Sequence, residues 1–140
     1  MKIPVMLSLQ SRQTYEDQEP DVIELVTEGT MEFLNGGWDI CYEESDLTEM
    51  AGVTTQFRVE PGRVILRRSG KLVSEMIFEE GTRHTSLYQM EFGALMITVC
   101  ADRIFAQLGS HGGMIDIVYR IEIENTAAGT VDYHLVISAK

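Results

Sequence analysis

Turn signals at short, regular intervals constrain this chain more than any other feature of its sequence. Clusters of glycine, asparagine or proline recur between segments rich in β-branched and aromatic residues, at 35–37, 61–62, 69–71, 80–81, 92–93, 109–113 and 125–129. Such clusters between short apolar runs are typical of hairpin turns. Together with the polar stretches 16–20 and 45–52, they predict nine connections and about ten strands, with no helix long enough to link parallel strands.

Alternation of apolar and polar residues supports the same prediction, because residues two apart share one face of a strand. One face of 115–123 carries four isoleucines and a tyrosine, whereas the other is mostly charged, and 23–33 and 131–138 show similar patterns. Gly29 falls on the apolar face of its segment, where a missing side chain would let a long strand bend. The apolar phase shifts within 95–108, which predicts a bulge near Asp102 and Arg103.

These strands predict an all-β fold, in which a single domain spanning 1–140 forms a closed or nearly closed antiparallel meander barrel of about 8–10 strands. One-sided apolar strands must bury their faces against each other, and an open sheet would leave two exposed edges. Closure removes those edges. A two-sheet sandwich predicts similar strands, but its Greek-key crossings need longer connections. The segment Asp46-Leu47-Thr48-Glu49 has the spacing of a helix capping box, so one helical turn and a short loop both fit there.

The charge balance excludes two classes of partner. Eleven Lys and Arg residues oppose 22 Asp and Glu residues, for a formal net charge of −11. Such a surface repels phosphate backbones and anionic headgroups, so we expect neither nucleic acid nor membrane binding. Cys41 and Cys100 are far apart and form no C-x-x-C pair, which favours a cytoplasmic protein without a disulfide framework. The first ten residues alternate like a strand rather than a signal peptide, and no segment is long enough to span a bilayer.

A resemblance to a known family extends over nearly the whole chain. It depends on the run from Gly70 to Gly81, on Thr85-Ser86-Leu87-Tyr88 and on Phe92-Gly93-Ala94-Leu95. These residues resemble the YwiB-like family of small uncharacterised bacterial proteins. The resemblance implies a calycin-like barrel, related in architecture to lipocalins and fatty-acid-binding proteins, and implies no catalytic residue, cofactor or ligand.

The polar residues of the middle hairpins are the candidates for a ligand site. His84 and Tyr88 share one face of a predicted strand, and Arg67 and Arg83 lie nearby in sequence. An interior arginine or histidine with a tyrosine hydroxyl would hold the carboxylate or phosphate of a partly apolar ligand. The competing interpretation places Arg67, Arg68 and Arg83 on the outer surface, paired with acids, because buried arginines are scarce.

Metal and catalytic chemistry are not favoured. His84, His111 and His134 lie on separate elements without the spacing of a metal site, so we expect no metal and no cofactor. Adjacent acids such as Glu43 and Glu44 point to opposite faces of a strand, so they cannot converge on one bond as acid and base. No nucleophile motif is present either, and we therefore do not expect an enzyme.

Two functions follow from these observations. The first is a barrel that binds a small, partly apolar, anionic ligand in its interior, since about ten strands leave more room than eight. The second is a protein-interaction or self-assembly module, with a filled barrel and an acidic outer face that recruits a basic partner or a second copy as a homodimer. The eight methionines suit either an adaptable cavity or ordinary core packing.

Overall fold

The computed structural model describes residues 2–15, 18–45 and 50–140, which form ten β-strands in one sheet. The strands are Ile3–Thr14 (β1), Asp21–Leu34 (β2), Gly37–Glu43 (β3), Val53–Glu60 (β4), Arg63–Gly70 (β5), Ser74–Phe78 (β6), Arg83–Met90 (β7), Gly93–Gly109 (β8), Gly112–Ile123 (β9) and Thr126–Ala139 (β10). Their order in the sheet is β6-β5-β4-β3-β2-β1-β10-β9-β8-β7, and each strand is antiparallel to its neighbours in this order. The predicted all-β hairpin architecture is therefore confirmed. The capping-box segment 46–49 lies outside the described residues.

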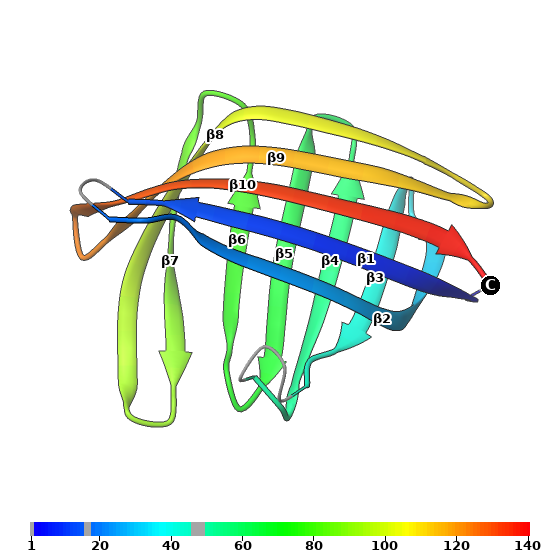
Figure 1. Ribbon diagram of the computed structural model, residues 1–140, viewed down its shortest axis with the longest axis horizontal. Coiled ribbons are helices and arrows are strands. Elements are labelled where there is room, and N and C mark those ends of the chain that lie inside the picture. The colour runs from blue at the N-terminus through cyan, green and yellow to red at the C-terminus, as the bar shows by residue number, and fades with distance from the viewer. Residues whose placement is uncertain (1, 16–17, 46–49) are drawn as a thin grey trace.

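The sheet curls until its two outer strands, β6 and β7, approach each other. The N–H and C=O groups of Val73 and Gln89 exchange hydrogen bonds of 2.9 and 2.8 Å beside these strands, and the Gly81 N–H donates to the Ala101 carbonyl at 2.9 Å. The long strands β1, β2, β9 and β10 cross in front of β3–β6 (Figure 1). The result is a nearly closed barrel with one sparsely paired seam between β6 and β7.

Two local features accompany the long strands β2 and β8 where their pairing changes. Strand β2 pairs with β1 as far as Met31 and begins to pair with β3 at Thr30. A Cβ atom on Gly29 would lie 2.4 Å from the Cys41 carbonyl oxygen, so glycine permits this close approach. In β8, the register with β9 shifts between Ala101 and Arg103, which confirms the predicted bulge.

Inward-facing apolar side chains fill most of the barrel. The largest that are fully buried are Phe57, Phe78, Leu7, Met31, Ile40, Ile115, Ile117 and Leu135. Each such side chain contributes about 1.5–3 kcal/mol through its removal from water. Within the described part of the chain, no helix is long and apolar enough to cross a bilayer.

Candidate functional site

A row of polar residues points inward across β3–β6. Tyr42 on β3 lies opposite Thr55 on β4, Thr55 opposite Arg68 on β5, and Arg68 opposite Ser74 on β6. Tyr42, Thr55 and Ser74 are all buried. Because residues directly opposite one another share a face of the sheet, the Arg68 side chain lies inside the barrel.

The opposite wall contributes two tyrosines, Tyr119 on β9 and Tyr133 on β10. Together with Tyr42 and Arg68 of the inward row they line a cavity of about 140 Å³, which we call the Arg68 cavity. Its full lining is Leu9, Ser11, Gln13, Ile23, Tyr42, Glu44, Met50, Leu66, Arg68, Tyr119, Ile121, Val131 and Tyr133. The lining therefore combines an arginine, a carboxylate, an amide and several hydroxyl groups with apolar side chains.

Three buried polar atoms near this cavity have no hydrogen-bond partner among the described residues. They are Arg68 Nε, Ser74 Oγ and Tyr133 OH. The Tyr133 hydroxyl interacts with the Tyr42 hydroxyl strongly enough to contribute to the pKa shifts of both, although the pair falls short of full hydrogen-bond geometry, so Tyr133 is the least isolated of the three groups. Buried polar groups are nearly always paired in native proteins, and exceptions often mark a bound water or ion. Arg68 and Tyr133 line the cavity, and Ser74 lies opposite Arg68 in the adjoining groove, so these atoms indicate a site for a molecule that accepts hydrogen bonds.

Burial keeps the tyrosines of the cavity protonated. It raises the pKa of Tyr42 and that of Tyr119 to about 12, and raises the pKa of Tyr133 well above 10. Nearby Glu44 adds to the rise in the pKa of Tyr42, whereas Arg68 acts against the rise at all three tyrosines. Neutral phenols donate hydrogen bonds, so the cavity presents donors at neutral pH.

A buried carboxylate, that of Glu44, also lines the cavity. Its side chain is almost fully buried, and its Oε2 accepts a hydrogen bond of 2.6 Å from Thr55 Oγ1. Glu44 and Arg68 carry opposite formal charges, so the cavity lining does not accumulate positive charge. This arrangement suits one added negative charge better than two.

The Arg68 cavity lies close to the outer surface at the β6–β7 seam. A groove of about 500 Å³ runs there, with Arg67, Arg68, Ser74 and Ser86 among its lining residues. Arg68 lines both the groove and the cavity. Arg68 therefore lies at the boundary between the barrel interior and the solvent.

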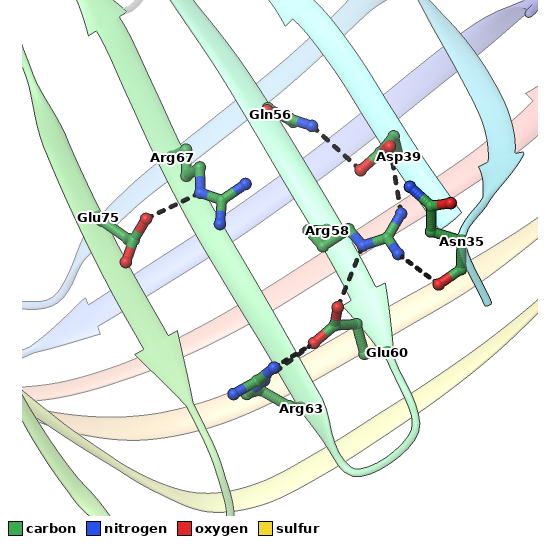
Figure 2. Close-up of polar contacts among 8 residues, drawn as sticks. All are labelled: Asn35, Asp39, Gln56, Arg58, Glu60, Arg63, Arg67 and Glu75. Atoms are coloured by element: carbon green, nitrogen blue, oxygen red, sulfur yellow. Dashed lines mark hydrogen bonds and ion pairs between the residues drawn. The ribbon is translucent and has the colours of Figure 1, made fainter. Parts of the chain in front are cut away.

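The two arginines predicted as ligand contacts lie on the outer face. Arg67 is exposed, and its Nε donates to Glu75 Oε2 at 2.8 Å on the neighbouring strand (Figure 2). Arg83 is exposed and forms an ion pair with Glu122 on β9. For these two residues the geometry agrees with the competing interpretation of solvent-facing arginines. Arg67 reaches the seam groove, but neither residue lines the Arg68 cavity.

The two other predicted contacts lie on the inward face of β7. His84 is half-buried, with its Nε2 3.0 Å from Glu79 Oε1, and Tyr88 packs against the core. They lie opposite Val99 and Leu95 of β8. The strand phase predicted for His84 and Tyr88 therefore holds, but neither side chain lines the Arg68 cavity.

Sequence reasoning missed Arg68, although the signal was present. Val64, Leu66 and Arg68 are spaced two residues apart, and the first two belong to the core. Strict alternation therefore places Arg68 inside and Arg67 outside. The general scarcity of buried arginines predicts an outward Arg68, and this prediction is wrong.

A second arginine, Arg58, lies on the outer face of β4 and is only 9% exposed. Its guanidinium contacts Asp39 Oδ2 at 3.2 Å, Glu60 Oε2 at 3.3 Å and the Asn35 carbonyl oxygen at 3.1 Å (Figure 2). Gly37 makes room for it, because a Cβ atom there would lie 2.8 Å from Arg58 Cζ. With these acceptors already in place, the Arg58 cluster is a structural network rather than a binding site.

Possible metal ligands do not gather in the parts of the chain that the structure describes: no three His, Cys, Asp or Glu side chains there are placed to hold a metal ion together. The two histidine pairs, His84 with Glu79 and His134 with Asp116, are isolated contacts on the barrel wall.

The chain is similar in sequence and in structure to known proteins. Residues 7–135 match the family described as "Domain of unknown function (DUF1934)". The "Uncharacterized beta-barrel protein YwiB" of Bacillus subtilis (strain 168) is 32% identical over 82 residues, which are 59% of this chain. That alignment spans 56% of the relative's own length. The crystal structure of YwiB from Bacillus subtilis matches with a TM-score of 0.88 at 23% identity, over 99% of this chain and 93% of the other. This structural likeness shows the shared β-barrel fold.

Proposed function

The chain belongs to the DUF1934 family of YwiB-like β-barrel proteins, as the resemblance in 70–95 predicted, and we propose that its barrel binds a small monoanionic molecule in the Arg68 cavity. One observation carries the proposal: Arg68 Nε, Ser74 Oγ and Tyr133 OH are buried near a cavity without a partner among the described residues. A bound acceptor would satisfy such groups.

A carboxylate is the headgroup that fits these donors best. A guanidinium N–H and a hydroxyl can each donate to one of its oxygens, and a charge-assisted hydrogen bond contributes about 1.5–3 kcal/mol. A dianionic phosphate would bring a second negative charge close to Glu44, and Arg68 is the one cation among the described lining residues that offsets it. The proposed ligand is therefore a monocarboxylate.

The size of the cavity limits the rest of the ligand. A volume of about 140 Å³ is close to that of the apolar cavities of about 150 Å³ that take up benzene. Leu9, Leu66 and Val131 would contact the apolar body. An aromatic or short branched acid fits this space, whereas a long-chain fatty acid requires more.

The β6–β7 seam provides the route of access. Its hydrogen bonds are concentrated at Val73–Gln89 and near Ala101, and sparsely paired segments open at lower free energy than fully paired strands. The groove on the seam reaches Arg68 from outside. A carboxylate arriving there would meet the guanidinium first.

Thermal-shift measurements with benzoate, isovalerate and inorganic phosphate test the proposal, using Arg68→Gln and Arg67→Gln as a matched pair. We expect a carboxylate to raise the melting temperature at about 10 mM and phosphate to have little effect. Arg68→Gln should weaken carboxylate binding by about tenfold or more, because the charged donor is lost. Arg67→Gln changes the same charge on the outer face and should leave the affinity within about twofold. Equal losses in both variants, or no stabilisation by either carboxylate, would contradict the proposal.

A further inference from the structure

One segment of β8 has a partner strand on one side only. Strand β7 pairs with β8 from Gly93 to Cys100, and the backbone of Glu80 bridges to Ala101. Strand β9 continues along the other side as far as Gly109. Within the described residues, 104–108 therefore form an open edge.

The backbone of this segment points its free hydrogen-bonding groups away from β9. The Ile104 N–H donates to Glu80 Oε1 at 3.1 Å on the open side. In an antiparallel strand, every second residue directs its N–H and C=O to the same edge, so those of Ala106 and Leu108 also face the open side. Among the backbone hydrogen bonds of the described residues, none reaches Ala106 or Leu108 from this side. Glu80 caps the end of the edge and leaves the following residues available.

The open edge borders an apolar cleft of about 500 Å³. Phe105 and Leu108 line it from β8, and Phe33, Trp38 and Val64 line it from the ends of β2, β3 and β5. Phe33 and Phe105 are 56% and 48% exposed, which is unusual for such large apolar side chains. Trp38 and Val64 lie at the ends of β3 and β5 away from Tyr42 and Arg68, so this cleft is distinct from the Arg68 cavity.

We propose that the open edge of β8 binds an extended segment of another protein, which adds as a strand to residues 104–108 and places alternate apolar side chains in the cleft. Strand addition matches an edge that offers repeated backbone donors and acceptors next to an apolar surface. Unprotected edges otherwise expose a protein to aggregation, and sheet proteins usually block them. At a rise of about 3.4 Å per residue, a peptide of about five to seven residues covers this edge.

Charge favours a basic segment over a second copy of the chain. Glu60 and Glu80 line the cleft, and Glu79 lies in an adjoining hollow. Glu60 is shared by Arg58 and Arg63, so Glu79 and Glu80 supply the negative charge that remains beside the cleft. The whole chain carries a net charge of −11, so two copies repel each other. Lysine or arginine at the outward positions of an added strand would be attracted instead.

The probe for this site is a capped peptide of about seven residues that alternates valine and lysine. Its controls are a valine–glutamate peptide of the same length and a valine–lysine peptide with N-methyl groups on the backbone nitrogens that face β8. Amide hydrogen exchange and chemical-shift mapping on the whole protein locate binding. We expect the valine–lysine peptide to slow exchange at Ala106 and Leu108 by about tenfold or more, and to bind about tenfold more tightly than either control.

Ala106→Pro provides the matching change in the protein. Ala106 is exposed, and its N–H faces the open edge, where proline is tolerated in strands. We expect this variant to keep the β9 pairing and lose peptide binding. The N-methylated peptide gives the same information on the unaltered protein if the variant does not fold. Equal binding of the N-methylated peptide, protection elsewhere in the barrel, or no binding would overturn the proposal. Protection of Ala106 that rises with protein concentration without peptide would also overturn it, in favour of self-association.

Discussion

Arg58 and Arg68 lie on adjoining strands, on opposite faces of the same wall, and their surroundings differ sharply. Arg58 faces outward, yet it is only 9% exposed and contacts two carboxylates and a carbonyl oxygen. Arg68 faces inward, and its buried Nε has no partner among the described residues. The surface arginine is therefore well paired, and the interior arginine is not.

Because of this difference, we expect Arg58 to stabilise the fold and Arg68 to contribute little to its stability. Taking a guanidinium out of water costs several kcal/mol unless anions and acceptors surround it. The Arg58 cluster provides them within the folded chain. The Arg68 cavity provides Glu44 and neutral hydroxyl groups, which leaves a donor for an external acceptor. Strained or incompletely paired polar groups often mark functional sites, where stability is lost in favour of binding.

The largest effect is expected for Arg58→Met, which leaves Asp39 and Glu60 without their shared partner. The free energy of unfolding in urea should fall by about 2–4 kcal/mol, because breaking a largely buried ion pair exposes its desolvation cost. Arg58→Lys keeps the charge but loses the planar guanidinium. Its free energy of unfolding should lie between those of Arg58→Met and the wild type. A loss below about 0.5 kcal/mol for Arg58→Met would show that the cluster is only a surface contact.

Gly37→Ala tests the same cluster from the backbone side. Its Cβ atom would lie 2.7 Å from the Val59 carbonyl oxygen and 2.8 Å from Arg58 Cζ, so the guanidinium must move. We expect Gly37→Ala to lower the free energy of unfolding in urea by about 1–3 kcal/mol. The double variant with Arg58→Met should lose less free energy than the two single variants lose together. Gly109→Ala is the control, because a Cβ atom there meets nothing within 4 Å. If the losses of the two single variants add fully in the double variant, Gly37 does not act through the Arg58 cluster.

Arg68→Met should give the opposite result to Arg58→Met. Without ligand, its free energy of unfolding should stay unchanged or rise by about 1 kcal/mol, since an apolar side chain replaces an incompletely paired cation. The stabilisation by carboxylates should disappear. Arg67→Met serves as a surface control, and its free energy of unfolding in urea should change by less than about 0.5 kcal/mol. A loss as large as that of Arg58→Met would remove the contrast between the two arginines.

The smallest effect at neutral pH concerns the tyrosines around Arg68. Their pKa values are raised in the folded state, to about 12 for Tyr42 and Tyr119, above the ordinary value of 10. Folding therefore favours the protonated phenol, so this contribution to stability is fully present below pH 10 and is lost as the pH rises towards 12. Circular dichroism and tyrosinate absorbance should change together in this range.

Tyr42→Phe is the variant that checks this assignment. Removing one of the buried phenols should move alkaline unfolding to higher pH, because one fewer group ionises on unfolding. If the buried tyrosines ionise near pH 10 while circular dichroism shows an intact fold, burial does not raise their pKa values as described above.

Much of the fold could be predicted because alternation and turn chemistry are local properties. The ten strands and the bulge in β8 follow from patterns within one segment, whereas the close approach of Gly29 to the Cys41 carbonyl is a contact with the next strand. The orientation of Arg68 is also local, since it shares a phase with Leu66. The candidate site was less predictable, because its members come from strands at both ends of the chain.

The sequence by itself determined that the chain is a meander of one-sided strands and which residues share a face of a strand, because both depend on a side-chain period of two. Only the tertiary structure decided that Tyr119 and Tyr133 converge on Arg68, that β6 and β7 leave a sparse seam, and that β8 keeps an open edge. Those features depend on the tilt and stagger with which the sheet curls. Tilt and stagger are properties of all ten strands together, so no single segment encodes them.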